Sequence, residues 1–556
     1  MRIFSTNAVS PKIVYLFFQI LVTVQHLHAQ PTFRKLNGGI EFDYGNCIME
    51  TADKGLCIVG STNSYGSGND DVYVIKLDSN SNTEWSKTFD WGRKEYGMSA
   101  VITKDHGVAI TGYCNKNSFS DSGWDAFVMK LDAKGNVLWN KTIGGTSQDN
   151  SRNIVENKTG ELLIAGCTRS FGVGFYDVYI TKLTAEGDLM WAKTYGTAND
   201  DIAYAITATN NGFAFAGTSN GLKPFVTKCD SSGNIIWSKT IAASAYSSTS
   251  LGAFNSIVQT SDNGFALTGY TRTASRGYDI VNVKLSFNGR IEWFTLFGNK
   301  GDDKGNSIIQ DVRGNYVITG YADYARKRYP ESLNIIKINS KGGLLWERTI
   351  TEQLDASGNS VIRWKNDGYV VAGIAWQSAG GDLYKPDLYL AAFDTLGTIC
   401  GNAGTYTTIR KVIPHIEDLN FDTLSGGTAT SNIVTSYKGG KFSDQCIALT
   451  ATVVTDADAS KISNLPAQTN TFHITVLPNP VTSGILALQI NIDYETAIQF
   501  SVTDIAGNIL ITKKIQVPSN TTYNTTINVS GLAQGVYLLK ANNNFTQQSI
   551  KFIKAN

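Results

Sequence analysis

A phrase that ends in tryptophan recurs along most of this chain, and it constrains the fold more than any other feature. Two clear copies read KLDAKGNVLW, ending at Trp139, and KLTAEGDLMW, ending at Trp191. A period of roughly 50 residues indicates a repeat architecture in which one small unit is copied many times. The tryptophans of the phrase are Trp85, Trp139, Trp191, Trp237, Trp293 and Trp346.

One copy of the repeat shows what the unit is. Residues 98–144 contain four apolar segments of strand length, separated by turns that contain glycine. Val, Ile, Tyr, Phe and Trp dominate these segments, and no helical periodicity is visible in them. Four antiparallel strands, repeated, are typical of a propeller blade. An aromatic content of 11% and 53 glycines agree with many short strands joined by tight turns.

The two ends of the repeat give the number of blades. Phe33 in FRKLNGG stands where Trp139 stands in WNKTIGG, and Cys400 stands at the final tryptophan position. Seven intervals separate these two residues, so we predict a seven-bladed β-propeller of four-stranded antiparallel blades over residues 31–400. The last blade lacks the phrase of its outer strand, which residues 31–39 carry. We therefore expect this amino-terminal segment to close the ring.

The repeated residues have structural interpretations. We expect each tryptophan to pack between blades, because so many blades share it; a stacking platform for sugars is the functional alternative. Each lysine of the phrase is expected to lay its methylene stem along a neighbour and keep its ammonium group in water. The Asp-x-x-Gly step predicts a hairpin turn in which the aspartate bonds the backbone.

The first residues of the chain predict export. Arg2 and Lys12 precede an apolar run from Ile13 to Val24, which is typical of a signal peptide over residues 1–29. This run is too short to span a bilayer, and no later segment is long and apolar enough, so we expect no transmembrane segment in the mature chain. A net charge of +1 gives no indication of nucleic-acid binding.

The segment after the repeats has a different composition. Residues 401–470 are rich in Gly, Thr and Ser without a blade pattern, and we interpret them as a linker. Cys400 and Cys446 flank its first part, and in an exported protein we expect them to form a disulfide that closes a loop. The other five cysteines lie in or beside blade strands and are expected to act as small buried groups.

A second pattern covers the carboxy-terminal residues, 471–556. Short strands surround turns here, and four phrases follow one another in order: Pro478-Asn479-Pro480, Asp504-x-x-Gly507, Gly535-x-Tyr537 and Lys551-Phe552-x-Lys554. This region resembles the type IX secretion sorting domain of Bacteroidota. The resemblance implies a small Ig-like β-sandwich, contact with the type IX secretion machinery, and a protein that is released or attached at the cell surface. The blade phrases are likewise similar to those of surface propellers that carry this domain.

Carboxylates gather on the predicted end of the propeller that carries the long connections. An oxygen-rich ring there could hold Ca²⁺, and no other cofactor is expected. The simpler interpretation is that these aspartates bond local backbone at the start of each third strand. The calcium candidates are Asp71, Asp125, Asp177, Asp279 and Asp387.

The sequence assigns no catalytic residue. The G-x-S-x-G match at 217–221 has no helix after it, and the mature chain has three dispersed histidines. We favour a non-enzymatic exported propeller that binds a polysaccharide, a protein or a surface component through its long-loop face. The alternative is a secreted glycoside hydrolase or lyase with carboxylates at the propeller mouth. In the blade that ends at Trp237, GLKPF (221–225) replaces the long loop, and we choose it as a candidate asymmetric site.

Overall fold

The protein consists of two compact units, residues 1–450 and 451–556. The computed structural model describes residues 32–554 except 68, 92–93, 116–122, 221, 243–250, 274–276, 300, 324–330, 351–354, 377–384, 401–402, 405–407, 411–414, 426–427, 431–434, 439–442, 445–471, 478–483, 493–495, 505–508, 518–520 and 543–546. The predicted signal peptide, 1–29, lies outside the described residues. In the described part every regular element is a strand, and no helix there could span a membrane.

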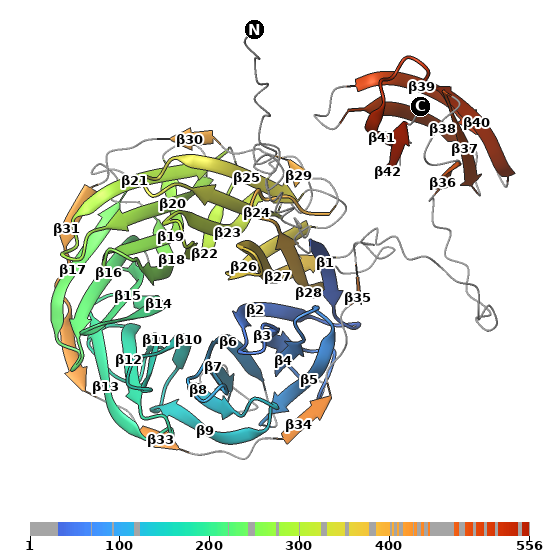
Figure 1. Ribbon diagram of the computed structural model, residues 1–556. Helices are drawn as coiled ribbons and strands as arrows, with labels where there is room; N and C mark the ends of the chain where they lie inside the picture. The colour runs from blue at the N-terminus through green and yellow to red at the C-terminus, as the bar shows by residue number, and fades with distance from the viewer. Residues whose placement is uncertain are drawn as a thin grey trace, which may run out of the picture. The chain divides into compact units, whose positions relative to one another are not determined.

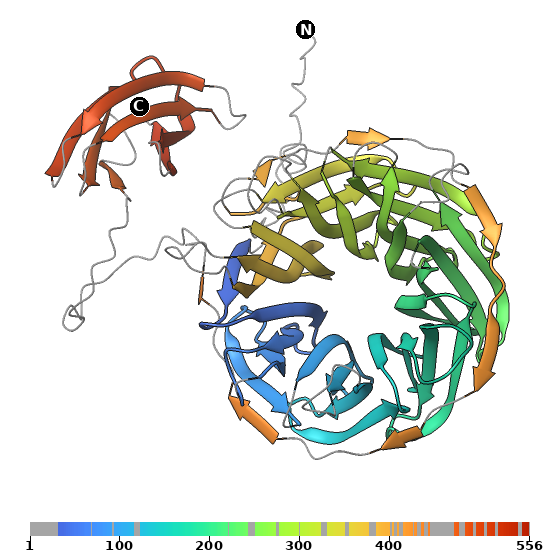
Figure 2. The ribbon, with the colours of Figure 1, turned by 180° about the vertical axis from the view of Figure 1, so that it is seen from behind.

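The first unit is a ring of seven blades (Figures 1 and 2), as the sequence predicts. Blades 1 and 2 are β2 (Asp43–Glu50), β3 (Leu56–Thr62), β4 (Asp71–Leu77), β5 (Thr83–Asp90), and β6 (Glu95–Ile102), β7 (Val108–Asn115), β8 (Trp124–Leu131), β9 (Val137–Gly144). Blades 3 and 4 are β10 (Asp149–Glu156), β11 (Leu162–Thr168), β12 (Asp177–Leu183), β13 (Leu189–Gly196), and β14 (Asp201–Thr209), β15 (Gly212–Ser219), β16 (Lys223–Asp230), β17 (Ile235–Ala242). Blades 5 and 6 are β18 (Gly252–Gln259), β19 (Phe265–Thr273), β20 (Gly277–Leu285), β21 (Ile291–Gly298), and β22 (Lys304–Gln310), β23 (Tyr316–Asp323), β24 (Glu331–Ile338), β25 (Leu344–Ile350).

Blade 7 closes the ring with both ends of the repeat. It contains β26 (Asp355–Trp364), β27 (Gly368–Trp376) and β28 (Pro386–Phe393), and its outer strand is the amino-terminal β1 (Phe33–Asn37). β1 runs antiparallel to β28, with Phe33 opposite Ala392. The expected closure by the amino-terminal segment is confirmed. It leaves no blade without an outer strand.

The recurring phrase folds into the hairpin between the third and fourth strands of a blade. In blade 2, Asp132 Oδ1 accepts hydrogen bonds from the backbone amides of Lys134 and Asn136, both at 2.8 Å. Gly135 adopts a positive φ of 74°, which glycine alone takes without strain. The hairpin places Lys130 directly opposite Trp139. The two most regular residues of the repeat are therefore cross-strand neighbours.

Five of the six phrase tryptophans pack against the turn of the following blade, as expected; at the turn after Trp191, Gly233 meets Tyr195 and Lys193 instead. A Cβ added to Gly187 of blade 3 would lie 2.8 Å from the ring of Trp139 of blade 2, so only a glycine fits beneath the indole. Trp139 Nε1 also donates to the carbonyl of Ala185, at 3.3 Å. The same glycine contact recurs on Trp85, Trp237, Trp293 and Trp346. The tryptophan of one copy and the glycine of the next thus form the joint between blades.

The expectation that the phrase lysines keep their ammonium groups in water is wrong. Lys130 is 3% exposed, and its Nζ lies 2.8 Å from Asp105 in the first turn of the same blade. Four other phrase lysines are buried and ion-paired in the same way: Lys76, Lys182, Lys284 and Lys337. In these five blades the fold therefore supplies a carboxylate for each buried ammonium group, whereas Lys228 of blade 4 is only half-buried.

Residues 403–444 correct the prediction of a linker over 401–470. Seven short strands in this segment each pair antiparallel with the outer strand of one blade, visiting blades 6, 5, 4, 3, 2, 1 and then 7 (Figure 1). We call this segment the belt. Its strands are β29 (Ala403–Gly404), β30 (Thr408–Arg410), β31 (His415–Asp418), β32 (Asp422–Ser425), β33 (Thr428–Thr430), β34 (Thr435–Lys438) and β35 (Ser443–Asp444).

The second unit is a two-sheet β-sandwich. One sheet has the strand order β36-β37-β40 and the other β39-β38-β41-β42. Both sheets contribute to one apolar core that includes Leu488, Phe500, Leu539 and Phe552. The Ig-like connectivity expected from the sequence stays a prediction. The strands are β36 (Phe472–Leu477), β37 (Ile485–Ile492), β38 (Thr496–Thr503), β39 (Ile509–Val517), β40 (Thr521–Asn528), β41 (Gly535–Asn542) and β42 (Gln547–Lys554).

Candidate functional site

The two ends of the propeller differ in their connections. At one end, tight turns join first to second strands and third to fourth strands; the backbone bonds Thr103 N to Gly107 O (3.0 Å) and Asp132 N to Asn136 O (2.9 Å) close them in blade 2. At the other end lie the connections between second and third strands and between blades. We call this the long-loop end. Because a rigid scaffold holds these longer connections, it is the end where a binding site is expected.

Carboxylates meet in pairs at the long-loop end. At the boundary between blades 2 and 3, Asp125 of a third strand and Asp149 of the next first strand lie on either side of Gly144. A Cβ added to this glycine would come within 2.6 Å of Asp125 Oδ1 and 2.7 Å of Asp149 Oδ2. Equivalent neighbours are Asp177 and Asp201, and Asp279 and Asp303. Each predicted calcium candidate therefore lies at its own blade boundary, and the five do not surround one common ion.

Local backbone and hydroxyl groups hold these aspartates, as the simpler interpretation expected. Asp149 accepts hydrogen bonds from the Gly145 amide, at 2.7 Å, and from the hydroxyls of Ser170 and Thr168. Burial, with a smaller contribution from the nearby Asp279 carboxylate, raises the pKa of Asp303 to about 7. Burial and like charge thus favour a proton on one member of such a pair.

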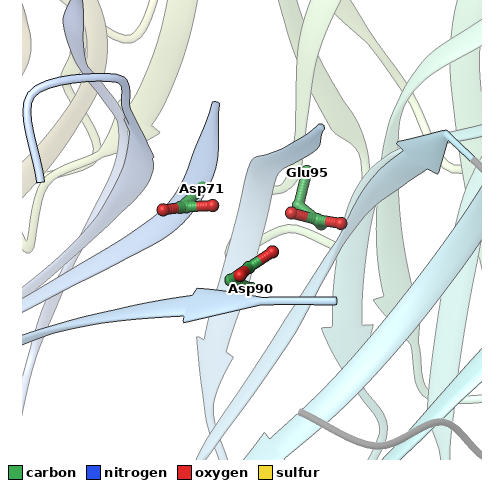
Figure 3. Close-up of side chains that lie close together, drawn as sticks. All are labelled: Asp71, Asp90 and Glu95. Carbon is green, nitrogen blue, oxygen red and sulfur yellow. The ribbon is translucent and has the colours of Figure 1, made fainter. Parts of the chain in front are cut away.

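The boundary between blades 1 and 2 departs from this pattern. Asp71 of β4 and Glu95 of β6 correspond to the usual pair, but Asp90 stands at the end of β5 as a third carboxylate. One oxygen of each of the three lies within 4.8 Å of one oxygen of the others (Figure 3). All three are buried, with at most 6% of any residue exposed. We call these residues the carboxylate cluster.

A second departure from the repeat pattern involves the first strand of each blade, which lies innermost in the ring. Each of the seven first strands has a β-bulge. In four blades the bulged residue is an asparagine whose amide donates to a glycine carbonyl of the next blade, at 2.8–3.1 Å: Asn46, Asn255, Asn306 and Asn359. In blades 2, 3 and 4 the bulged residues are Met98, Arg152 and Tyr204. One continuous sector of the ring therefore lacks this repeated contact.

Aromatic rings gather in the same sector. Tyr96 and Tyr113 have centroids 5.2 Å apart, and Trp124 lies 5.7 Å from Tyr96 and 5.4 Å from Tyr113. The guanidinium carbon of Arg152, from blade 3, lies 5.3 Å from the centre of the Tyr113 ring. All four side chains are partly exposed. We call these four residues the aromatic cluster.

The aromatic cluster is joined to blade 1 through Asp70. The Tyr96 hydroxyl donates to Asp70 Oδ2 at 2.6 Å, and Lys94 Nζ lies 3.8 Å from the same oxygen. Burial and the hydrogen bond to Asp70 raise the pKa of Tyr96, so the hydroxyl stays a donor. Since Asp70 precedes Asp71 and Tyr96 follows Glu95, the aromatic and carboxylate clusters are adjacent. Apart from Asp71, the residues of the two clusters were not predicted; the signal available for Asp90 was that glycine stands at its position in other copies of the repeat.

The cysteines are described in part by the structure. Cys400 is disulfide-bonded, but Cys446 lies outside the described residues, so their pairing stays a prediction. Burial raises the pKa of the Cys57 and Cys229 thiols to about 12, in agreement with inert packing groups.

The short connection of blade 4, predicted as a candidate site, forms a turn in which the amide of Leu222 donates to the carbonyl of Ser219 at 3.1 Å. The choice of this short connection as an asymmetric site stays a prediction.

The sorting-motif residues lie partly in the described strands. Tyr537 of β41 donates its hydroxyl to the Ala533 carbonyl, at 2.8 Å, and stacks on Phe552 of β42 with centroids 5.7 Å apart. The backbone pairs Gly535 with Lys554 and Leu538 with Lys551. Asp504 follows β38. The motif residues outside the described part are Pro478, Asn479, Pro480 and Gly507.

Comparisons with known proteins identify the second unit. Residues 475–555 match the family described as the secretion system C-terminal sorting domain. With the four motifs in order, this shows a type IX sorting domain, which indicates an exported protein, extracellular or at the cell surface. It also implies interaction with the type IX secretion machinery.

The chain also resembles other proteins more distantly. The regulatory protein FlaEY of Caulobacter vibrioides is 24% identical over 200 residues, 31% of this chain and 21% of that protein. An uncharacterized protein of Aquifex aeolicus is 28% identical over 166 residues, 30% of this chain and 43% of that protein. The match thus spans less than half the length of either relative. The solved structure of PorZ, a surface component of the type IX secretion system of Porphyromonas gingivalis, is 12% identical with a TM-score of 0.33, covering 91% of this chain and 73% of that one.

Proposed function

We propose that this protein is an exported, non-enzymatic propeller that binds a polysaccharide at its long-loop end, through the aromatic cluster. The observation that carries the proposal is the loss of the asparagine contact in blades 2, 3 and 4, next to Tyr96, Tyr113 and Trp124. Residues that depart from a repeat are not required by the repeated scaffold, so a specific role explains them better than blade packing does.

The chemistry of the cluster suits a sugar. Aromatic rings offer flat apolar faces against which the C–H groups of a pyranose ring pack. Arg152 supplies several N–H donors for sugar hydroxyls, and Asp70, which is itself buried, holds the Tyr96 ring in place through its hydrogen bond to the hydroxyl. A partly exposed apolar surface with a few polar groups is typical of small-molecule sites. Export to the cell exterior would bring such a surface into contact with polysaccharides.

The alternative, a glycoside hydrolase or lyase, has weaker support. Such enzymes need two carboxylates that reach opposite sides of the scissile bond. Asp71, Asp90 and Glu95 form a close group of carboxylates, but they are buried below the surface that a polysaccharide would contact. Their geometry favours a structural role over proton transfer to a substrate.

A glycan array probed with the full mature chain tests the proposal. We expect binding to a limited set of glycans, weakened at least tenfold by Tyr96→Ala or Trp124→Ala. The control is Phe287→Ala, which removes an aromatic side chain that is 60% exposed in a tight turn at the opposite end; it should bind like the unchanged protein. Absence of any glycan binding, or equal loss in the control, would contradict the proposal. Release of reducing ends that Asp70→Asn abolishes would favour the enzymatic alternative.

A further inference from the structure

The carboxylate cluster at the boundary between blades 1 and 2 has a feature that the other boundaries lack. The position five residues after the phrase tryptophan, or after Phe33, is a glycine in four blades: Gly38, Gly144, Gly196 and Gly298. In all four a Cβ would come within 2.6 Å of a carboxylate oxygen of the third-strand aspartate in the same blade. Asp90 therefore places a third carboxylate where the repeat otherwise leaves room for two.

The side chain of Thr88 also lies beside the carboxylate cluster. Thr88 lies two residues before Asp90 on β5, so both side chains leave the same face of the strand. Its hydroxyl is fully buried and has no hydrogen-bond partner among the described residues. A Cβ on Gly66 would overlap Asp71 Oδ2 and lie 3.0 Å from Thr88 Oγ1, so the hydroxyl and the carboxylate are neighbours. An unpartnered buried hydroxyl beside the Asp71 carboxylate, on the same strand face as Asp90, indicates a ligand at the cluster.

The donor set defines the chemistry of that ligand. Carboxylate and hydroxyl oxygens, without sulfur or imidazole, suit hard divalent cations. Oxygens around Ca²⁺ lie 2.3–2.6 Å from the ion, so oxygens within 4.8 Å of one another fit a single coordination shell. We propose that Asp71, Asp90 and Glu95, with the Thr88 hydroxyl, bind one Ca²⁺ ion between blades 1 and 2. Backbone carbonyls or water would complete its shell.

Such an ion would act as a clamp between neighbouring blades. Asp71 and Asp90 belong to blade 1, and Glu95 is the first residue of blade 2. The ion would also fix the base of the aromatic cluster, because the amide of Glu95 donates to the carbonyl of Asp70 at 2.6 Å. This inference does not depend on the proposed function, since cation binding is measured without any glycan.

Terbium luminescence tests the site directly. Tb³⁺ replaces Ca²⁺ in oxygen sites, and Trp91 and Tyr96, which flank two of the ligands in sequence, can sensitise its emission. With chelator-treated full-length protein we expect one saturable emission signal that Ca²⁺ competes away. Ca²⁺ should also raise the midpoint of thermal unfolding, because it binds the native state.

Two variants and a control make the outcome decisive. Asp90→Gly gives blade 1 the residue found in four other blades, so it should fold, and we expect it to lose at least 90% of the terbium signal and the calcium-dependent rise in Tm. Asp90→Asn, of the same shape, should weaken binding at least tenfold. Asp303→Asn removes a carboxylate from a boundary where Gly298 stands in place of Asp90, and it should leave terbium binding unchanged. No saturable signal in the unchanged protein, or an undiminished signal in Asp90→Gly and Asp90→Asn, would overturn the proposal.

Discussion

At the scale of single residues, the repeat phrase contains two contacts, the hairpin turn and the buried lysine ion pair. The first was predictable from the sequence and the second was not. The aspartate and glycine of the hairpin turn were predictable, because their bonds are local and recur wherever such a turn forms. The burial of the lysine was not, since its partner comes from a different turn of the same blade. Lys130 meets Asp105, which lies 25 residues earlier. A carboxylate at the same place in the first turn of several blades was the signal available for this pairing.

The lysine pairs predict how stability depends on pH. Burial alone would raise the pKa of Asp105, but hydrogen bonds from Lys130 and Thr103 outweigh it and lower the pKa to about 2. Asp53 and Asp262 behave alike. A carboxylate with a depressed pKa stabilises the fold above its unfolded pKa, and this contribution is lost as the pH falls from about 4 to about 2. Urea unfolding at pH 5, 3.5 and 2 should show that loss. Asp105→Asn should be less stable at pH 5 and should change less with pH; an equally steep decline would contradict the assignment.

The contact between tryptophan and glycine predicts a difference between two alanine substitutions. Gly187 and Gly160 have φ values of 85° and 89°, so alanine costs similar backbone strain at both, about 1–2 kcal/mol. A Cβ at Gly187 also meets Trp139 at 2.8 Å, whereas at Gly160 the nearest atom, Glu156 Oε1, is 3.9 Å away. We expect Gly187→Ala to lower the free energy of unfolding by a further ~1–3 kcal/mol. Equal losses for the two variants, measured by urea unfolding, would mean that the indole does not restrict this position.

At the scale of secondary-structure elements, the belt is the part that the sequence did not predict. Its strands are two to four residues long, too short for a recognisable alternation of apolar and polar residues. They are strands because each finds the free edge of a blade, and such an edge is visible only in the folded ring. The blade strands were predictable for the opposite reason. Their continuous apolar runs, such as β3 and β4, are buried along their whole length.

A side-chain anchor of the belt can be tested with a matched pair. Phe421 lies against Phe225 of blade 4, with ring centroids 5.3 Å apart, and belongs to the edge of an apolar core cluster. Leu424, three residues on, is 47% exposed. Phe421→Ala should lower the free energy of unfolding by about 1–3 kcal/mol, and Leu424→Ala should stay within about 0.5 kcal/mol of the unchanged protein. Thermal and urea unfolding of both variants provide the measurement. Similar small effects at both positions would show that the belt is held by its backbone bonds alone.

At the scale of the whole molecule, the sequence predicted the ring, the sorting domain, their order and the long-loop end as the binding face, but among the residues of the two clusters it singled out Asp71 alone. Ring and sorting domain depend on motifs that repeat or occur together, and such patterns stand out in one sequence. The candidate site consists of exceptions such as Asp90 and Arg152. An exception becomes meaningful only when the fold shows which residues lie beside it, as Figure 3 does for the carboxylates.

The division into two units predicts that export and folding can be separated. Residues 475–555 form the sorting domain, and the propeller with its belt ends before residue 451. A chain that ends at residue 470 should keep the thermal unfolding midpoint of the propeller within about 2 °C, because the second unit has its own core. In cells it should no longer reach the surface, which fractionation and immunoblotting would detect. Surface delivery of the shortened chain would show that the sorting signal lies elsewhere.

The path of the belt has a consequence for the order in which the ring is completed. The first belt strand pairs Ala403 with Ile350, whereas the last pairs Ser443 with Leu36 at the far end of the chain. Because closing a loop costs more entropy as the loop lengthens, the first of these contacts is the easiest to form and the last the hardest. Each belt strand that has paired with its blade holds the next belt strand close to the next blade. The belt strands should therefore pair in chain order, from β29 to β35. The final step joins the two most distant parts of the propeller, and slow, late ordering of blade 7 is the kinetic signature to expect.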